Sequence, residues 1–559
     1  MCTIAEAYKK VPMMFQAQTK GRCQLNYLQQ NIPKQDVEIW TEQWTEKADD
    51  KTPEFPKDVK TKTYQISWRF VTNGGQDEGI IRPVMGAYGV SFYPGSSMKG
   101  AFLQACRKLA PDKVKDYCGD AGQPGCLRFH GGYPVDDSWQ KDLVDLVHPQ
   151  QEWQVKTNNT CNKPRGESAF ALISLYQPEL KFGISSIKDL DKTEWEKIWQ
   201  IWDDAVSSGL GCRVSAGYGQ PKKQKGQIIY RAYLEGQGIA STVIGGESEF
   251  RPNMFKASIR GHALRIFGGL TDAKTAERLV ENLFGGVTGS GTHGLLAINW
   301  KDTVKPVYGE FESGYNEPTY KVKGILRWRL TQEISSKRKI ALTELIKALM
   351  RFAMLLGGFG KSWRRVDHRL FYERYYQGNG IKPLIGCHWR WSNKSLDNSN
   401  LVTSIRSVGS CLDKVQAIAK QWIQLEGIKL TPNKCANWRE AWHQDKVQVW
   451  GRIARERTDS KAIKWFHGAY PNSNNPQGSI YRTDVTGDIG QISRIWHRMY
   501  PLLVMNPATG NPEYPDAFDR DETKYLELLT IFPNSKENDL YDDFLDFIDS
   551  DIGGFQWLW

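Results

Sequence analysis

A repeated pair of motifs constrains the fold of this 559-residue chain more than any other feature of its sequence. The segment "PGSSMKGAFLQACRKL" at 94–109 aligns without a gap with "FKASIRGHALRIFGGL" at 255–270. Each is followed, after a similar length of chain, by an apolar helix pattern, a glycine run and a group of cations. Because two different elements recur in the same order, we infer an internal duplication in which each copy folds as a unit.

Periodic apolar residues predict the elements of each copy. Helical spacing covers 195–206 in the first copy, where Thr193 and Glu196 match a capping box, and 342–356 in the second, which Gly357-Gly358 should end. Alternation over 64–70 and 320–330 predicts a half-buried strand in each copy. The order of strands, helix, strands, helix and glycine loop predicts an α+β fold of the ferredoxin-like type.

The starts of the two aligned helices are candidate phosphate sites. Ser96 and Ser97 are good N-cap residues, and Lys99 adds a charge close to the helix start. The second copy offers Ser258 and Arg260, with Arg265 further along. A single copy would favour an ordinary capped helix, but the pairing of both copies with basic glycine loops favours phosphate binding.

The glycine loops are the second candidate site. Glycine lets backbone approach a ligand closely, and cations beside it suit a sugar-phosphate backbone. The candidate cations are Arg213, Lys222 and Lys223 in the first copy, and Lys361, Arg364, Arg365 and Arg369 in the second. Tyr218 and Trp363 have two interpretations, stacking on bases or packing in the core.

Charge and composition indicate the class of partner. The net charge is +11, but 513–551 carries 13 acidic and 3 basic residues, so the remainder carries +11 − (−10) = +21. This excess favours a polyanion such as nucleic acid over simple solubility. No apolar run approaches the ~20 residues of a membrane span, and the N-terminus lacks an apolar signal stretch. We therefore expect a cytoplasmic protein without a membrane partner.

A zinc site is the weaker interpretation of a cysteine-rich stretch. Cys118 and Cys126 lie in "YCGDAGQPGCLRFHGG", with Cys106, His130 and Cys161 near in sequence. The spacing lacks a CxxC pair, which favours buried free thiols over a zinc ion.

The motifs "FYPGSSMKGAF" and "GLGCRVSAGYG", and then "ASIRGHALRIF", "LFGGVTGSG" and "GGFGKSWRRVDHR", resemble the RAMP superfamily of CRISPR proteins over about 61–225 and 245–372. The resemblance implies two ferredoxin-like (RRM-like) RAMP domains in tandem, at 1–230 and 231–512. The stretch 490–501 is similar to a late strand of such a domain, which would make about 377–479 an insertion. An acidic, aromatic tail at 513–559 would dock on the chain's own body or on a neighbouring protein.

The resemblance also implies a function. Members form the backbone and ends of CRISPR ribonucleoprotein effectors, so we expect a guide-RNA-binding subunit of a type III effector. Its partners would be guide RNA, target RNA and other effector subunits. The alternatives are a stand-alone CRISPR RNA-processing endonuclease and a non-catalytic end cap or scaffold.

A catalytic residue is implied by the same resemblance. The "PGSSMKG" form is similar to type III backbone subunits in which a loop aspartate cleaves target RNA. Asp77 stands five residues before Arg82, as in the family's pattern, although Glu78-Gly79 departs from it. Asp77 would then orient a ribose 2′-hydroxyl or hold a divalent cation, Mg²⁺ or Mn²⁺. A solvated loop carboxylate is the alternative.

Overall fold

The chain divides into two units. A computed structural model describes residues 36–46, 48, 52–77, 80–147, 155–156, 170–223, 227–242, 248–286, 292–308, 319–360, 388–392, 395–396, 402–430, 434–456, 458–471, 478–487, 493–505, 512–513, 524–533, 539–550 and 552–559. Unit 1 comprises 1–149, 165–227 and 242–247, and unit 2 comprises 150–164, 228–241 and 248–559. Both units mix helices with several small sheets, which confirms the α+β class.

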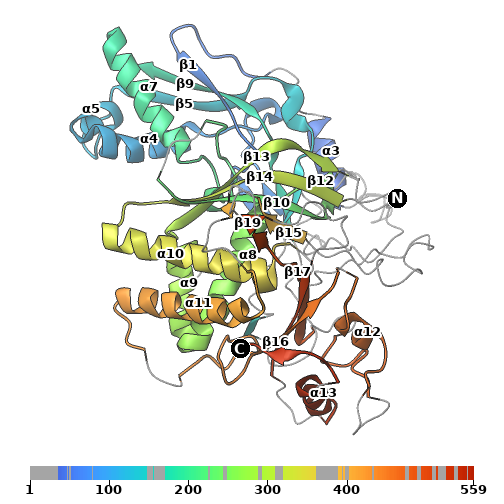
Figure 1. The fold of residues 1–559 in the computed structure, drawn as a ribbon. Helices are drawn as coiled ribbons and strands as arrows, with labels where there is room; N and C mark the ends of the chain where they lie inside the picture. Colours follow the sequence, from blue (N-terminus) through green and yellow to red (C-terminus); the bar gives the residue numbers. More distant parts are fainter. Residues whose placement is uncertain are drawn as a thin grey trace, which may run out of the picture. The chain divides into compact units, whose positions relative to one another are not determined.

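The main sheet of unit 1 has three antiparallel strands, with β9 in the middle. Its members are β1 (Lys60–Gln65), β9 (Glu179–Ser186) and β5 (Leu127–Pro134). The helices α4 (Gly95–Leu109) and α7 (Lys192–Ser207) pack against it, as Figure 1 shows. Phe102, Phe182 and Trp202 are fully buried between these layers. Beyond β1 the chain continues beside Pro221, which bridges to Ile66 in the antiparallel sense.

A smaller four-stranded sheet and several short elements complete unit 1. The sheet order is β3-β4-β7-β6, and β4 and β7 run parallel. The remaining elements are α3 (Asp36–Thr45), β2 (Arg69–Phe70), β3 (Gly75–Asp77), β4 (Ile80–Arg82), α5 (Val114–Cys118), β6 (Val144–Val147), β7 (Phe170–Ile173) and β8 (Leu175–Tyr176). The predicted strand at 64–70 is thus divided into the end of β1 and β2.

Unit 2 begins with an antiparallel sheet in the order β13-β14-β10-β15. Its elements, in chain order, are β10 (Ile228–Ile239), α8 (Asn253–Leu270), α9 (Ala273–Phe284), β13 (Leu296–Tyr308), β14 (Thr319–Leu330), α10 (Ser336–Phe352) and β15 (His388–Trp391). Apolar residues of β14 are buried in alternation, as predicted. The predicted end of the 342–356 helix is also correct, because a π-helical turn follows α10 and Gly358 stands at φ +63°.

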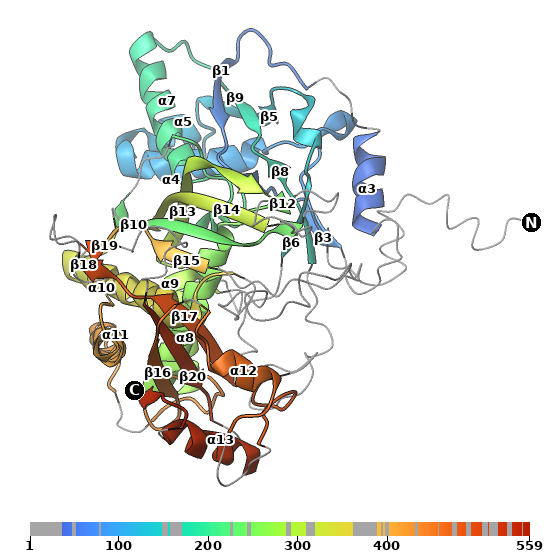
Figure 2. The same ribbon diagram turned by 45° about the vertical axis from the view of Figure 1, so that its right-hand side comes forward.

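A further sheet of unit 2 has the order β17-β20-β16-β21. Figure 2 shows α12 and α13 beside it. The elements are α11 (Arg406–Leu425), β16 (Gln448–Ala454), α12 (Ala462–His467), β17 (Ile495–Pro501), β20 (Tyr525–Ile531), α13 (Asp539–Asp549) and β21 (Gln556–Trp557). The stretch 490–501 therefore contributes to this sheet, whereas β15, from within 377–479, completes the preceding one.

The acidic segment 513–559 contributes to the core of unit 2. All seven residues of β20 are buried, and β20 lies between β17 and β16. Phe544 and Ile548 of α13 are fully buried against Trp465 of α12 and its neighbours. Of the two docking alternatives, the described part of this segment follows the first, packing on the chain's own body.

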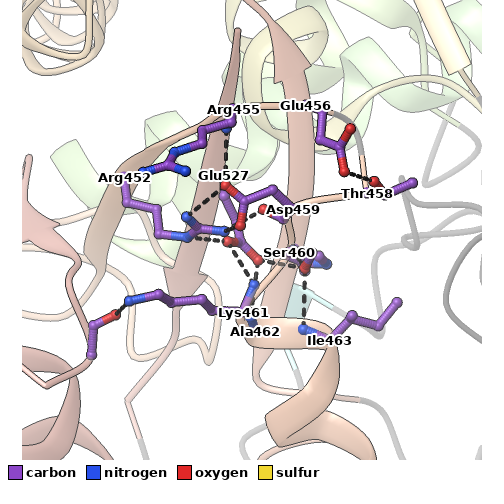
Figure 3. Close-up of polar contacts among 12 residues, drawn as sticks. Arg452, Arg455, Glu456, Thr458, Asp459, Ser460, Lys461, Ala462, Ile463 and Glu527 are labelled. Atoms are coloured by element: carbon purple, nitrogen blue, oxygen red, sulfur yellow. Dashed lines mark hydrogen bonds and ion pairs between the residues drawn. The ribbon is translucent and has the colours of Figure 1, made fainter. Parts of the chain in front are cut away.

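A buried carboxylate joins the strands of this sheet to α12. Glu527 of β20 is fully buried and accepts hydrogen bonds from Arg452 Nε (2.5 Å), Ser460 Oγ (2.5 Å) and His497 Nε2 (3.0 Å). It also accepts from the backbone N–H groups of Lys461 and Ala462, at 3.0 and 2.9 Å (Figure 3). These five donors satisfy the buried charge of Glu527, and the two backbone hydrogen bonds fix the start of α12 on the sheet.

One segment leaves unit 1 to join unit 2. The fully buried Val155 accepts a backbone hydrogen bond from Glu440 N (3.1 Å), and Lys156 pairs with Glu277 (2.6 Å). Both contacts lie within unit 2, although 165–227 returns to unit 1.

Candidate nucleic-acid interface

The start of α4 differs from the prediction in one respect. The N-cap is Pro94, not Ser96 or Ser97, and no side chain caps the helix. Gly95 fixes this start, because a Cβ there would lie 2.1 Å from the Phe129 carbonyl oxygen of β5. Ser96 and Ser97 therefore occupy the first turn, where both are exposed. A first turn with exposed hydroxyls still suits an anion, since its N–H groups point out of the helix end.

The glycine loop at 209–219 folds tightly onto the chain itself. Cys212 N donates to Val71 O (2.8 Å), and Gly219 N donates to Arg69 O (2.7 Å). Gly209, Gly211, Gly217 and Gly219 all have positive φ. A Cβ at Gly211 would lie 2.2 Å from Val71 O, and one at Gly219 would lie 1.8 Å from Leu210 O. Gly211 and Gly219 are thus required for close backbone contacts of the loop with itself and with Val71. The sequence had suggested instead that the glycines let a ligand approach.

Arg213 is the cation that this loop presents. It is exposed and has φ +56°, a left-handed conformation immediately before the short turn at Val214–Ala216. Such a conformation costs a non-glycine residue about 1–2 kcal/mol. The tight loop on both sides of Arg213 holds this conformation, which is a pattern typical of functional positions.

Tyr93 brings the two predicted elements together. It directly precedes Pro94, the N-cap of α4, is 6% exposed, and its hydroxyl donates to Ser97 O at 3.3 Å. Burial raises the pKa of Tyr93 to about 12, with a contribution from Cys212, while a hydrogen bond from the Gly211 backbone opposes the rise. The start of α4 and the glycine loop therefore both contact Tyr93, and the exposed polar residues of the two elements are Ser96, Ser97, Lys99 and Arg213. Sequence reasoning missed Tyr93, although its place directly before "PGSS" was a signal.

The helix α7 leads into the glycine loop, which begins two residues after the helix ends. Its N-cap is Asp191, whose side chain accepts from Glu194 N (2.8 Å), so the predicted capping box of Thr193 and Glu196 was wrong by two residues. Asp203 ties the helix to β1 by accepting from Lys62 Nζ (2.8 Å) and Tyr64 Oη (2.7 Å).

Lys222 and Lys223 follow the glycine loop directly. Both are exposed, and Lys222 N donates to Gln65 O (2.9 Å), three residues after the contact of Gly219 with Arg69.

The second copy does not reproduce the first. The helix α8 begins at Asn253, so Ser258 lies in its second turn and is 7% exposed. Arg260 is half-buried, and Arg265 is fully buried in an ion pair with Glu440 (2.5 Å). Ser258 as a helix-start residue and Arg265 as a phosphate ligand were therefore wrong. The cations Lys361, Arg364, Arg365 and Arg369 lie outside the described residues.

Asp77 lies at the end of β3, in a hairpin with β4. Its Cα partner is Ile80, and its side chain lies outside the described part of the structure. The base of the hairpin is close to the loop, because Val84 N donates to Thr72 Oγ1 (2.9 Å), next to Val71. Five residues of strand from that base reach about 17 Å.

Tyr218 belongs to the core rather than to a stacking surface. It is fully buried, its hydroxyl donates to Asp145 Oδ2 (2.5 Å), and its ring lies 4.6 Å from that of Trp68. Of its two interpretations, core packing is correct. Trp363 lies outside the described residues.

The cysteine-rich stretch shows buried thiols. Cys118 and Cys126 are 4% and 2% exposed within the apolar core of unit 1. Burial raises the pKa of Cys118 to about 11, with Cys106 contributing, so the neutral thiol is favoured over the thiolate that binds zinc. Among the described residues, no group of three or more His, Cys, Asp or Glu side chains is arranged to hold a metal ion. No described helix is long and apolar enough to cross a membrane.

Comparison with known proteins gives one family match and several distant structural likenesses. The RAMP superfamily model matches residues 82–222. A chain of the type III-B Cmr-beta complex bound to cognate target RNA is 17% identical with a TM-score of 0.23, over 29% of this chain and 58% of its own length. Cmr6 from Pyrococcus furiosus is 14% identical with a TM-score of 0.20, over 29% of this chain and 97% of its own. No curated protein matches the chain.

At these TM-scores neither likeness supports a statement about binding or activity. The family match covers α4, the glycine loop and Lys222. The resemblance drawn from the sequence motifs is thus confirmed for the first copy, whereas the motifs of the second copy lie outside the stretch that the RAMP superfamily model matches.

Proposed function

We propose that this chain is a guide-RNA-binding subunit of a type III CRISPR ribonucleoprotein effector, with target RNA and other effector subunits as its partners. The observation that carries the proposal is the meeting of the α4 start and the glycine loop through Tyr93. The exposed hydroxyls of Ser96 and Ser97 and the exposed cations Lys99 and Arg213 lie on these two elements, within the stretch that the RAMP superfamily model matches. Hydroxyls, cations and helix-end N–H groups are the usual ligands of nucleic-acid phosphates.

The order of elements supports two RAMP domains in tandem. In unit 2, strand, helices, two strands, helix and strand follow one another, and the sheet order β13-β14-β10-β15 is that of a ferredoxin-like domain. Unit 1 has the corresponding order β1-β9-β5, with Pro221 bridging to the chain after β1 in place of the fourth strand. In both units a glycine loop follows the second of the main helices.

Cleavage of target RNA belongs to the proposal through Asp77. Its support is the hairpin that begins and ends beside the glycine loop, within reach of a strand bound there. A divalent cation would supply charge stabilisation at the attacked phosphate. The described residues contain no ready set of ligands for it, so we derive no reaction step through a metal.

The test compares two charge removals on the full chain. Lys99→Ala with Arg213→Ala should weaken binding to RNA of any sequence. It should also lower the slope of log affinity against log salt by roughly 1.4, about 0.7 for each phosphate contact to a single strand. Lys181→Ala with Lys192→Ala is the matched control, because both lysines are exposed and Lys192 starts α7, about 24 Å from its loop end. If the two double variants have equal slopes of log affinity against log salt, Lys99 and Arg213 do not contact RNA.

The rival functions need a second experiment. The chain is purified alone and with the products of its neighbouring genes, and the bound RNA is sequenced. Guides found only in the assembled complex support an effector subunit, whereas specific cleavage of precursor RNA by the lone chain supports a stand-alone endonuclease. Guide binding without any cleavage supports an end cap or scaffold.

A further inference from the structure

A cavity of about 160 Å³ opens in unit 2 beside α10 and α11. Trp391 of β15, Tyr500 of β17 and Leu355 after α10 line it and are at most 2% exposed, so they form its floor. Ser410 and Lys414 of α11 also line it and are exposed, so they form its mouth. We call this cavity the α10–α11 pocket.

The pocket is cationic. Arg351 of α10 is 9% exposed and lines it together with Lys414, and the described lining includes no carboxylate. Both charges act on the lining thiol of Cys411: burial raises the pKa of this thiol, and Arg351 and Lys414 oppose the rise. Cations from both helices thus line a pocket whose floor is largely aromatic and aliphatic.

Side chains rather than backbone would recognise an anion here. The N–H groups of Ser407 and Val408, in the first turn of α11, donate to Ser404 O and Ile405 O, both at 3.2 Å. The Ser407 hydroxyl likewise donates to Ser404 O, at 2.5 Å. The α11 start therefore has few donors to offer, and recognition falls on Arg351, Lys414 and Ser410.

Size and charge together define the ligand class. An engineered cavity of about 150 Å³ holds benzene, so this pocket encloses one small ring or one phosphate group, and the rest of a larger ligand would lie outside its mouth. A phosphate monoester carries about −1.5 to −2 charges at pH 7, which two cations match, whereas a carboxylate carries one. We propose that the α10–α11 pocket binds a phosphate monoester on a small aromatic or apolar body, as in a nucleoside monophosphate, free or at the end of an RNA strand.

The position of Cys411 provides a direct assay. The full chain is alkylated at mildly basic pH with AMP, adenosine or inorganic phosphate present, and modification of each cysteine is followed by peptide mass spectrometry. AMP at about ten times its Kd should slow alkylation of Cys411 about tenfold, because the filled sites are protected. Cys435, a free and partly exposed cysteine of unit 2 that does not line the pocket, is the internal control and should react at an unchanged rate.

A matched pair of variants tests the role of charge. Lys414→Ala should need about ten- to a hundredfold more AMP for the same protection, the range for one charged hydrogen bond. Lys420→Ala removes an exposed lysine of the same helix that does not line the pocket, and should match the wild type. RNA with a 5′-phosphate or a 5′-hydroxyl then distinguishes the sources: protection by the phosphorylated strand alone indicates a strand end, and protection by AMP alone a free nucleotide.

Two results would overturn the inference. Equal protection by adenosine and AMP would make the pocket an apolar site without phosphate recognition. If neither AMP nor phosphorylated RNA protects Cys411 from alkylation, the cavity is a void in the packing and not a binding site. The pocket does not depend on the function proposed above, because Cys411 reports on unit 2 whether or not Arg213 of unit 1 binds RNA.

Discussion

Replacing Glu527, the buried carboxylate of β20, should make unit 2 less stable and should remove part of the pH dependence of that stability. In Glu527→Gln, an amide takes the place of a group that accepts from Arg452, Ser460, His497 and two backbone N–H groups. At least one of these donors would then face an NH₂ group. Arg452, whose side chain is 9% exposed, would keep Asp459 but lose its buried carboxylate partner. Breaking a buried ion pair in this way costs about 3–5 kcal/mol.

The pH dependence follows from the pKa of Glu527. Burial alone would raise this pKa, but the hydrogen bond and charge of His497, followed by Arg452 and Ser460, lower it from 4.5 to about 2. Since one pKa unit corresponds to about 1.36 kcal/mol, the ionised carboxylate contributes roughly 3 kcal/mol to folding. Because the folded pKa lies below the unfolded one, this contribution is complete above about pH 5 and is lost as the pH falls toward 2.

Hydrogen exchange of peptides from β20 and α12 is the appropriate assay, since a chain of two units need not unfold in one step. Protection in the wild type should fall between about pH 5 and pH 3, beyond the intrinsic change in exchange rate. The Glu527→Gln protein should start lower and show little of this fall. Asp546→Asn, at an exposed site on α13, is the control. If wild type and Glu527→Gln lose protection in parallel, the carboxylate is not the origin of the pH dependence.

Three further predictions concern the candidate interface. Gly219→Ala should destabilise unit 1 by about 2 kcal/mol or more, because its Cβ would lie 1.8 Å from Leu210 O at a φ of +61°; an unchanged denaturation midpoint would contradict this. Arg364→Ala with Arg365→Ala should weaken RNA binding without regard to sequence and lower the salt slope by roughly 1.4, and an unchanged slope in a folded protein would exclude contact. Asp77→Asn should leave RNA binding intact but abolish one metal-dependent cleavage site, whose product ends in a 2′,3′-cyclic phosphate; a complete cleavage pattern in this variant would leave the subunit a scaffold or end cap.

Local periodicity predicted the elements that a single segment determines. The alternation at 320–330 corresponds to β14, and the helical spacing before Gly357-Gly358 corresponds to α10 and the π turn. In both cases the pattern records which residues face the core. Ser96 and Ser97 lie in the first turn of a helix, α4, as the sequence predicted, although neither caps it, and phosphate binding there stays a prediction.

What the sequence did not predict depends on contacts between distant segments. The start of α4 is set by the close approach of Gly95 to Phe129, and the glycine loop by its contact with Val71. The aligned Ser258 is buried because α8 begins about one turn earlier than α4 does. Glu527 gave no local signal, because a glutamate in an acidic segment is expected on the surface.

The path of 150–164 has a consequence for how such a chain can be divided or recombined. Val155 fills the core of unit 2, although the chain on both sides of this segment belongs to unit 1. A gene fragment that begins at codon 228 would therefore encode a second unit with a hole in its interior. The two units therefore cannot be exchanged as continuous segments. A functional chimera has to take 150–164 from the same parent as 228–559 and carry it within the sequence of the first unit.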